Sequence, residues 1–459
     1  MLKKNLGLVI FGVLCLATSF VHAQLEPVVW TDDQIRQILS NRIDVEKQAV
    51  GIVVGLIDIN GKRVISHGST LASKPSQKPD GDTVFEIGSV SKVFTSLLLA
   101  DMVVKGEVAL DDPVSKYLPK TVTMPKRDGS EISLLSLSTH TSALPRMPSN
   151  LAPSNPKNPY ADYTVEMMYS FLSGLSLTKE IGKTYEYSNL GAGLLGHALA
   201  LRAGTDYETL VSTRVTKPLG MASTSIALTA DMQRRLAIGH DESLAAVSNW
   251  DIPTFAGAGA IRSTANDMLL LLEASMGKKK SPLDSAMTQQ KITRKPTGQP
   301  NLSMALGWHK LSKFGDVVWH NGQTGGYHSF VGFDEKRGVG VVVLCNTGAD
   351  IDDIALHLLD TRFPLKQPTL KVDPKVLDSY VGDYELIPTF VISITKQGDR
   401  LMLQATGQPK FEIFAESESK FFLKVVDAKV SFVKNKAGAV SELILHQNGA
   451  NQVGKKKMP

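Results

Sequence analysis

A long apolar helix that begins beside a serine constrains this chain more than any other stretch of its 459 residues. Residues 85–106 read FEIGSVSKVFTSLLLADMVVKG, and apolar side chains recur there at the spacing of a helix packed on several sides. Ser89 and Lys92 stand one helical turn apart near its start, and Gly106 is a typical C-terminal stop. Because residues i and i+3 share a helix face, we expect the Lys92 amine beside the Ser89 hydroxyl. A lysine whose pKa is lowered by burial can activate such a serine as a nucleophile.

The spacing SxxK is not specific by itself, because it occurs seven times in this sequence. Only the copy at Ser89 follows a hydrophobic stretch ending in glycine and opens a long apolar helix. That arrangement presents a side chain at a helix N-terminus. The alternative for Ser89 is a serine that only caps a core helix.

Two other segments hold residue types that suit the same chemistry. Tyr187 and Asn189 stand immediately before a second apolar helix, and the alternative is an asparagine cap with a packed tyrosine. Further along, a strand rich in β-formers runs through His320 and Gly322 to Gln323 and into a glycine-rich turn. Glycines at that point allow a backbone or a substrate to approach closely. The alternative is a hairpin edge with an exposed histidine.

The first 23 residues are typical of an export signal. Lys3 and Lys4 precede an apolar run at residues 6–17, and Val21 to Ala23 form a small-residue cleavage pattern. No other apolar run approaches the roughly 20 residues that a membrane helix needs. We therefore expect an exported protein, periplasmic or extracellular in a bacterial envelope, with no transmembrane anchor in the mature chain.

Composition argues against several other classes of function. The formal net charge of +5 becomes +3 once Lys3 and Lys4 are removed, and the chain has no basic and aromatic pattern for nucleic acid. Cys345 is the only cysteine outside the export signal, so an intramolecular disulfide is excluded. No phosphate-cradling motif or zinc-spaced cluster occurs, so we expect no cofactor and no metal.

The order of patterns along the chain predicts a mixed α/β (α+β) fold with a separate β module. A hairpin is expected at residues 51–66, a buried strand at 339–345 and a closing helix at 351–359. Five prolines at residues 145–159 predict a rigid loop that can form a wall of a substrate cleft. Short alternating segments from about residue 371 to the C-terminus predict a small all-β barrel or sandwich.

FEIGSVSK, YSN and WHNGQTGG, in this order and spacing, resemble the motifs of the serine β-lactamase and penicillin-binding protein superfamily. The flanking THTSALP, KPLGM and GAIRSTANDM make the chain most similar to the class C β-lactamase-related branch. The resemblance implies an antiparallel sheet flanked by helices in a hydrolase domain at 24–365, with a mostly helical subdomain near 115–255. It also implies a lipocalin-like C-terminal domain at 371–459.

The same resemblance implies roles for individual residues. Ser89 would be the acylated nucleophile and Lys92 its proton partner. Tyr187, as a phenolate or a hydrogen-bond relay, would be the general base and then the acid to the leaving group. Asn189 would orient the substrate amide. The remaining substrate-binding positions would be His320, Gly322 and Gln323. The backbone N–H groups of Ser89 and Gln323 would form the oxyanion hole.

The sequence departs from the family pattern at one position, where His320 stands in place of the lysine of a KTG triad. A histidine with an ordinary pKa near 6.5 is mostly neutral at pH 7. We therefore expect anionic substrates to be held less strongly than in a resistance enzyme, which disfavours efficient penicillin hydrolysis.

The function implied is a serine hydrolase that cleaves amide or ester bonds through an acyl-enzyme on Ser89. Its substrate could be a D-amino-acid peptide of the peptidoglycan or an ester, and peptidase, carboxypeptidase and esterase activities all fit. One alternative is a class C-type β-lactamase. Another is a penicillin-binding or cell-wall-fragment-binding protein without catalysis. The sequence leaves open whether Lys92 or Tyr187 takes the first proton.

Overall fold

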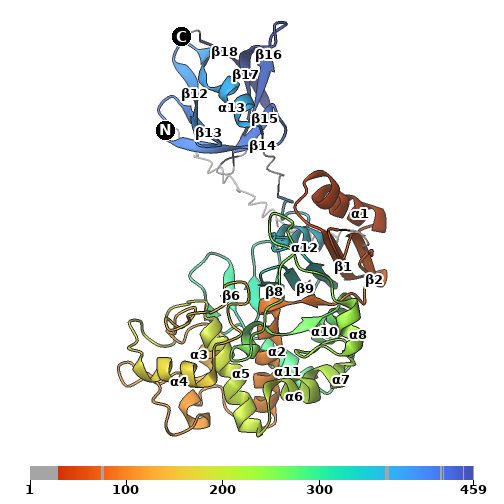
Figure 1. Cartoon of the computed structure of the whole chain (residues 1–459), viewed down its shortest axis with the longest axis vertical. Helices are drawn as coiled ribbons and strands as arrows, with labels where there is room; N and C mark the ends of the chain where they lie inside the picture. Colours follow the sequence, from red (N-terminus) through yellow and green to blue (C-terminus); the bar gives the residue numbers. More distant parts are fainter. Residues whose placement is uncertain are drawn as a thin grey trace, which may run out of the picture.

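The structure is a computed structural model that describes residues 29–73, 77–366, 372–423, 426, 428–447 and 449–457. The predicted export signal lies outside these residues. A sheet with helices on both faces comes first in the chain, and a closed β-barrel follows it (Figure 1). The predicted fold class, an antiparallel sheet flanked by helices together with a C-terminal barrel, is confirmed.

The large sheet has eight strands in the order β2-β1-β10-β9-β8-β7-β6-β5, and every neighbouring pair is antiparallel. Its strands are β1 (Gly51–Asp58), β2 (Gly61–Gly68), β5 (Lys295–Pro296), β6 (Leu302–Met304), β7 (His309–Leu311), β8 (Val317–Gln323), β9 (His328–Asp334) and β10 (Val339–Cys345). The predicted hairpin is β1 and β2. Strand β10 is buried along its whole length, as its continuous apolar sequence predicts.

Successive residues of β1 and β10 face two different hydrophobic layers. Val53 and Val342 belong to the layer with the apolar helix of residues 91–104, whereas Val54 and Val343 face the N-terminal helix and the closing helix. The helices are α1 (Asp32–Ser40), α2 (Ser91–Val104), α3 (Leu134–Ser138), α4 (Val165–Gly174), α5 (Asn189–Ala203), α6 (Tyr207–Val211), α7 (Lys217–Leu219), α8 (Ala230–Arg235), α9 (Ala256–Gly259), α10 (Ala265–Ser275), α11 (Asp284–Gln290), α12 (Asp352–Leu359) and α13 (Pro374–Tyr380). Figure 1 shows α1 and α12 on one side of the sheet and α2 and α10 on the other.

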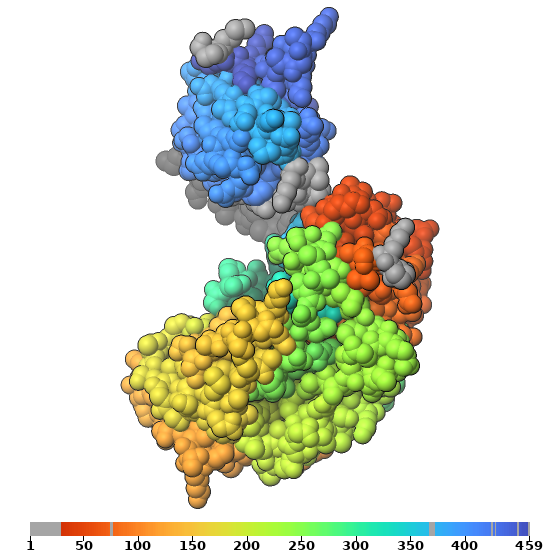
Figure 2. Space-filling view, viewed as in Figure 1, coloured from red at the N-terminus to blue at the C-terminus, as the bar shows by residue number. Residues whose placement is uncertain are grey.

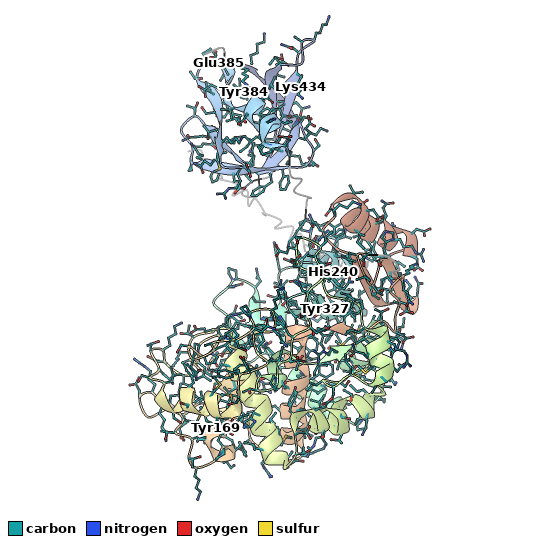
Figure 3. The ribbon with its side chains drawn as sticks, in the orientation of Figure 1. Tyr169, His240, Tyr327, Tyr384, Glu385 and Lys434 are labelled. Carbon is teal, nitrogen blue, oxygen red and sulfur yellow. The ribbon has the colours of Figure 1, made fainter. Side chains whose placement is uncertain are left out.

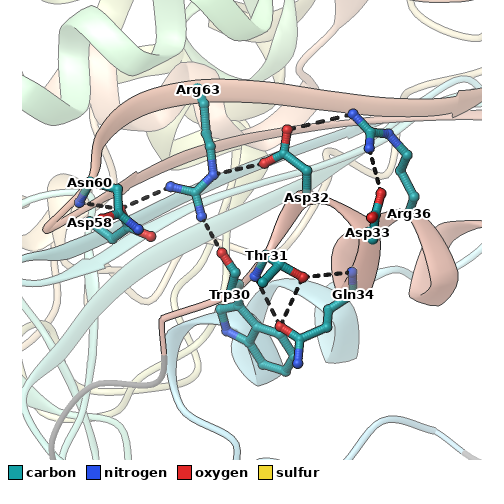
Figure 4. Close-up of polar contacts among 9 residues, drawn as sticks. All are labelled: Trp30, Thr31, Asp32, Asp33, Gln34, Arg36, Asp58, Asn60 and Arg63. Carbon is teal, nitrogen blue, oxygen red and sulfur yellow. Dashed lines mark hydrogen bonds and ion pairs between the residues drawn. The ribbon is translucent and has the colours of Figure 1, made fainter.

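Polar contacts attach the first helix to the sheet (Figure 4). Thr31 caps α1 in a capping box with Gln34. Arg63 of β2 donates to the backbone oxygen of Trp30 at 2.6 Å, to Asp58 at 2.9 Å and to Asp32 at 3.1 Å. One arginine thus joins the start of α1 to both strands of the first hairpin.

The region predicted to be mostly helical holds α3 to α8. All of residues 115–255 are described, and only isolated β-bridges occur among them. Helix α5 of this region packs against two helices outside it, α9 and α2. The N-terminus of α5 therefore comes close to the N-terminal end of α2, where Ser89 lies.

The C-terminal barrel closes β11 onto β18. Its strands are β11 (Gly382–Ile387), β12 (Phe390–Gln397), β13 (Arg400–Ala405), β14 (Lys410–Ala415), β15 (Lys420–Leu423), β16 (Ala428–Lys434), β17 (Val440–Gln447) and β18 (Ala450–Lys456). The ring of Tyr380, from α13, stacks on Phe432 with centroids 4.1 Å apart. Tyr384, which is labelled in the barrel in Figure 3, donates to the backbone oxygen of Tyr380. Helix α13 is thereby part of the barrel core.

We expect Phe432→Ala to destabilise the barrel by about 3–5 kcal/mol, because truncating a buried phenylalanine leaves a cavity. All four tryptophans precede residue 320. Tryptophan fluorescence therefore reports the sheet domain, and far-UV circular dichroism reports both parts. In thermal unfolding, Phe432→Ala should lower the midpoint temperature that circular dichroism reports for the barrel and leave the midpoint of the fluorescence transition unchanged. The control Val453→Ala, at a half-exposed residue, should change neither midpoint. A matching loss in the fluorescence transition would contradict separate folding of the barrel.

Candidate active site

Ser89 lies in a tight turn between β3 (Phe85–Glu86) and α2. A 3₁₀ turn at Gly88–Val90 leads into the helix, and Gly88 has a φ of +47°, in the left-handed region that favours glycine. A Cβ on Gly88 would come within 2.8 Å of the backbone nitrogen of Gln323. The sequence FEIGS is therefore needed both for the turn and for the close approach of β8.

The Lys92 amine lies at the centre of the site and is almost completely buried. Its Nζ lies 2.8 Å from Ser89 Oγ, 2.9 Å from Asn189 Oδ1 and 2.8 Å from the backbone oxygen of Ala258. Burial, with the charge of Arg146 as a second cause, holds the pKa of Lys92 well below its ordinary value. A neutral amine has two protons for the oxygens of Asn189 and Ala258, which leaves its lone pair for the Ser89 hydroxyl.

Tyr187 reaches the same place from the segment before α5. The Lys92 Nζ lies 4.8 Å from the centroid of the Tyr187 ring. Burial raises the pKa of Tyr187, although a hydrogen bond with Ser89 opposes that shift. The tyrosine is therefore a neutral phenol at pH 7, which disfavours the phenolate form. The structure thus brings together Ser89, Lys92, Tyr187 and Asn189.

Strand β8 packs directly against the Ser89 turn at Gly322. A Cβ on Gly322 would come within 2.1 Å of the backbone oxygen of Ile87 and 2.8 Å of the Ser89 nitrogen. Ser329, on the neighbouring strand β9, donates to the same Ile87 oxygen at 2.8 Å. Only glycine fits there, so the backbone nitrogens of Ser89 and Gln323 come to the same end of the cleft.

His320 lies beneath the cleft rather than in its wall. Its side chain is fully buried, so the alternative of an exposed histidine at a hairpin edge is wrong. The Nδ1 atom pairs with the Asn321 backbone oxygen at 2.6 Å, and Nε2 has no hydrogen-bond partner among the described residues. Burial, followed by the charges of His309 and Lys92, holds the pKa of His320 well below its ordinary value. His320 is therefore neutral at pH 7.

An open cleft of about 540 Å³ and a small hollow of about 40 Å³ meet at Ser89. Asn189, Gln323 and Tyr160 line both of them. Tyr160 lies just after the five prolines, and its ring meets Trp250 edge-on with centroids 5.3 Å apart. In Figure 2 the yellow surface of the segment around Asn158 lies beside the green surface of the segment around Asp251, whose backbone nitrogen donates to Asn158. Arg146 and Met147, which belong to the proline-rich loop, also line these hollows, so the loop contributes to the cleft wall, as predicted.

Several residues at the site were not singled out from the sequence. His140 accepts a hydrogen bond from the Ser188 backbone, and its ring lies 4.4 Å from that of Tyr187. Arg146 also lies over the Tyr187 ring, with its Cζ 5.1 Å from the centroid. Both belong to the stretch THTSALPR, which supported the family resemblance but gave no role to either side chain. His309 also lines the cleft, and its pKa is lowered by burial to about 4.

One group of side chains has the composition of a metal site. Ligand atoms of His328, Asp350 and Asp352 lie within 4.8 Å of one another. Asp352 already accepts from Asn321 at 2.6 Å and lies 2.9 Å from His328 Nε2, and Asp350 pairs with Lys366. These contacts account for both carboxylates without an ion.

The lowered pKa of Lys92 predicts the pH dependence of acylation. The neutral amine is the active form, so activity should be present above this lowered pKa and lost as pH falls through it. The acid limb of kcat/KM for an uncharged ester, measured from about pH 5 to 10, should lie well below the ordinary lysine value. A rate that still rises tenfold per pH unit at the upper end of this range, about pH 10, would contradict a neutral Lys92.

The fold and this cluster together define a serine hydrolase, in which a buried lysine and a phenol flank one serine hydroxyl. The chain belongs to the beta-lactamase family, whose model matches residues 32–359. A second model, a domain of unknown function (DUF3471), matches residues 366–456.

Relatives of known name include both peptidases and lactamases. The chain is 30% identical over 362 residues to the D-alanyl-D-alanine-carboxypeptidase/endopeptidase AmpH of Escherichia coli K12, covering 74% of this chain and 90% of that one. It is 28% identical to a beta-lactamase of Pseudomonas fluorescens, covering 68% of this chain and 93% of the relative. Among solved structures, a beta-lactamase/D-alanine carboxypeptidase from Yersinia pestis in complex with citrate has a TM-score of 0.63 at 26% identity, covering 73% of this chain and 98% of that one.

A search of the described helices for a membrane span found none with the length and apolar character to cross a bilayer.

Proposed function

We propose that this protein is an exported serine hydrolase that cleaves amide or ester bonds through an acyl-enzyme on Ser89. The observation that carries the proposal is the Lys92 amine, which is buried, held at low pKa and 2.8 Å from Ser89 Oγ. A serine hydroxyl becomes a strong nucleophile only when a base next to it removes its proton. A lysine that served only to stabilise the fold would not need its amine next to the Ser89 hydroxyl.

The lowered pKa of Lys92 and the raised pKa of Tyr187 support Lys92 as the base in the first proton transfer. Lys92 takes the Ser89 proton as Oγ attacks the substrate carbonyl, and the backbone N–H groups of Ser89 and Gln323 hold the oxyanion. The neutral Tyr187 gives its proton to the leaving nitrogen or oxygen as the carbonyl re-forms. The proton on Lys92 then restores the phenol, and Asn189 orients the substrate amide. A water molecule finally hydrolyses the ester on Ser89.

The substrate class we propose is a short peptide containing D-amino acids, such as those of the bacterial cell wall. Support comes from the relative named as a D-alanyl-D-alanine carboxypeptidase/endopeptidase, which matches 74% of this chain. A leading segment typical of an export signal agrees with a substrate outside the cytoplasm. If export occurs as proposed, the N-terminus of the mature protein should be Gln24.

A β-lactamase is the second candidate, favoured by the relative named as a beta-lactamase. One screen separates the candidates: purified protein is tested on D-aminoacyl anilides, peptides ending in D-alanyl-D-alanine, p-nitrophenyl esters and nitrocefin. Ser89→Ala protein serves as the background for each substrate. We expect Ser89-dependent release from peptides or anilides to exceed that from nitrocefin. Turnover of nitrocefin alone would instead support the β-lactamase.

A further inference from the structure

The cleft has a single permanently charged side chain among its lining residues. Lys92 lies beneath the wall, His320 is buried and neutral, and His309 has a pKa of about 4. Of the described side chains that line the two hollows, Arg146 is the only lysine, arginine, aspartate or glutamate. It lines the large cleft and not the small hollow.

The backbone of Arg146 is fixed to the catalytic segment. Its carbonyl oxygen accepts from the backbone nitrogens of Asn189 at 3.0 Å and Leu190 at 3.2 Å, at the N-terminus of α5. The preceding carbonyl, that of Pro145, accepts from the Ser188 hydroxyl at 2.7 Å. These three bonds hold the start of the proline-rich loop against the turn that carries Tyr187, so Arg146 has a defined position in the site.

Arg146 is an exposed residue that lines the cleft, and its guanidinium lies over the Tyr187 ring, with Cζ 5.1 Å from the centroid. No carboxylate among the described residues forms an ion pair with it. An arginine that stacks on an aromatic ring keeps its planar fork of N–H donors available at its edge. Such a fork matches the two oxygens of a carboxylate. Its charge also reaches the reacting groups, since Arg146 is among the causes that lower the pKa of Lys92.

We propose that Arg146 is the specificity-determining residue of this cleft and binds a carboxylate on the leaving group of the substrate. The inference rests on the proposed function, in which Tyr187 delivers its proton to the leaving group. Because Arg146 lies against Tyr187 and lines only the large cleft, its charge belongs to the leaving-group side. The enzyme therefore prefers peptides that end in a free carboxylate next to the cleaved bond, as a carboxypeptidase does, over neutral esters.

This assignment revises the expectation drawn from His320. A neutral histidine on β8 predicts weak binding of carboxylates only if no other cation replaces the missing lysine. Arg146 supplies that charge from a different element, the loop between α3 and α4.

A matched pair of substrates tests the proposal: an acylated D-alanyl-D-alanine peptide and the same peptide with a C-terminal amide. Wild-type protein should show a kcat/KM ratio of acid to amide of about 10 to 100, as expected for loss of a charge-assisted hydrogen bond. In Arg146→Gln the ratio should fall to near one, chiefly through KM for the acid, and Arg146→Lys should keep part of it. The surface control Arg36→Gln should retain the wild-type ratio.

Two results would overturn the proposal: a wild-type ratio near one, or a ratio in Arg146→Gln equal to that of wild type. An Arg146 that only tunes Lys92 or Tyr187 would change both substrates equally and leave the ratio intact. Labelling by an uncharged fluorophosphonate separates this failure from failure of the proposed function. Wild-type protein without Ser89 label would refute the hydrolase itself, whereas labelled protein that cleaves neither peptide, or both equally, refutes only the role of Arg146.

Discussion

Lys92→Met should lower the rate of Ser89 acylation by about 10²- to 10⁴-fold, the usual contribution of a positioned general base. Methionine has nearly the length of the lysine stem and fits an apolar site, but it offers neither the lone pair nor the two N–H donors. Asn189 Oδ1 and the Ala258 oxygen would each lose a partner. Stopped-flow labelling with a fluorescent penicillin measures the effect on acylation directly.

A lysine on the surface provides the matched control. Lys116 is an exposed residue that pairs with Asp112, so Lys116→Met should keep the wild-type acylation rate. The far-UV circular dichroism spectrum shows whether the Lys92→Met protein is folded. Acylation of folded Lys92→Met protein within threefold of wild type would contradict a base at this position, and would point to Tyr187 instead.

The second large effect is expected for Gly322→Ala, which should lower kcat by about 10²- to 10³-fold through damage to the oxyanion hole. The new Cβ would stand 2.1 Å from the Ile87 oxygen, so β8 must move away from the Ser89 turn. That movement separates the two backbone N–H groups that the oxyanion needs. Steady-state kinetics on the best substrate of the screen measures the loss, with KM changing less than kcat.

The matched control is Gly174→Ala at the end of α4. A Cβ at Gly174 meets no atom within 4 Å, and this glycine lacks a positive φ. The activity of the Gly174→Ala protein should therefore equal that of wild type. Near-wild-type kcat in Gly322→Ala would show that catalysis does not need the close packing of β8 against the Ser89 turn. It would then remove Gln323 from the proposed mechanism.

The fold was largely predictable wherever side-chain burial follows a local period. The first hairpin, α2 and β10 were predicted because apolar spacing alone marks them. In the barrel, the alternation that predicted an all-β module is not equally clear in every strand. The buried alternation of β16 is readable in its sequence, whereas most side chains of β18 are exposed. Strand β18 is held by backbone pairing with β17 and β11, which leaves no hydrophobic pattern to read.

At the site, contacts along one helix turn could be predicted, and contacts between distant segments could not. The Ser89 and Lys92 pair follows from local helix geometry. Tyr187 stands 98 residues later, and only the family resemblance indicated that it lies beside them. His320 was placed among the substrate-binding residues from its motif, but the structure buries it below the cleft. No periodicity in the sequence distinguishes a residue beneath a wall from one that lines it.

Arg146 could have been named from the sequence as a candidate for substrate binding. The loop that holds it was predicted as a cleft wall, and a lone arginine at the start of such a wall is a reasonable candidate for substrate binding. Its position over Tyr187 depends on hydrogen bonds from the α5 N-terminus to backbone oxygens. Backbone contacts of this kind carry no mark in residue identity, so the role could be proposed only from the structure.

Mass spectrometry of the intact and digested protein after exposure to a fluorophosphonate tests most directly whether one serine, Ser89, is the nucleophile. We predict one adduct per chain, located on Ser89, no adduct in Ser89→Ala, and full labelling in Ser154→Ala, which removes the serine of another SxxK sequence on an exposed loop. An adduct on a different residue, or labelling that persists in Ser89→Ala, would contradict the assignment of the nucleophile.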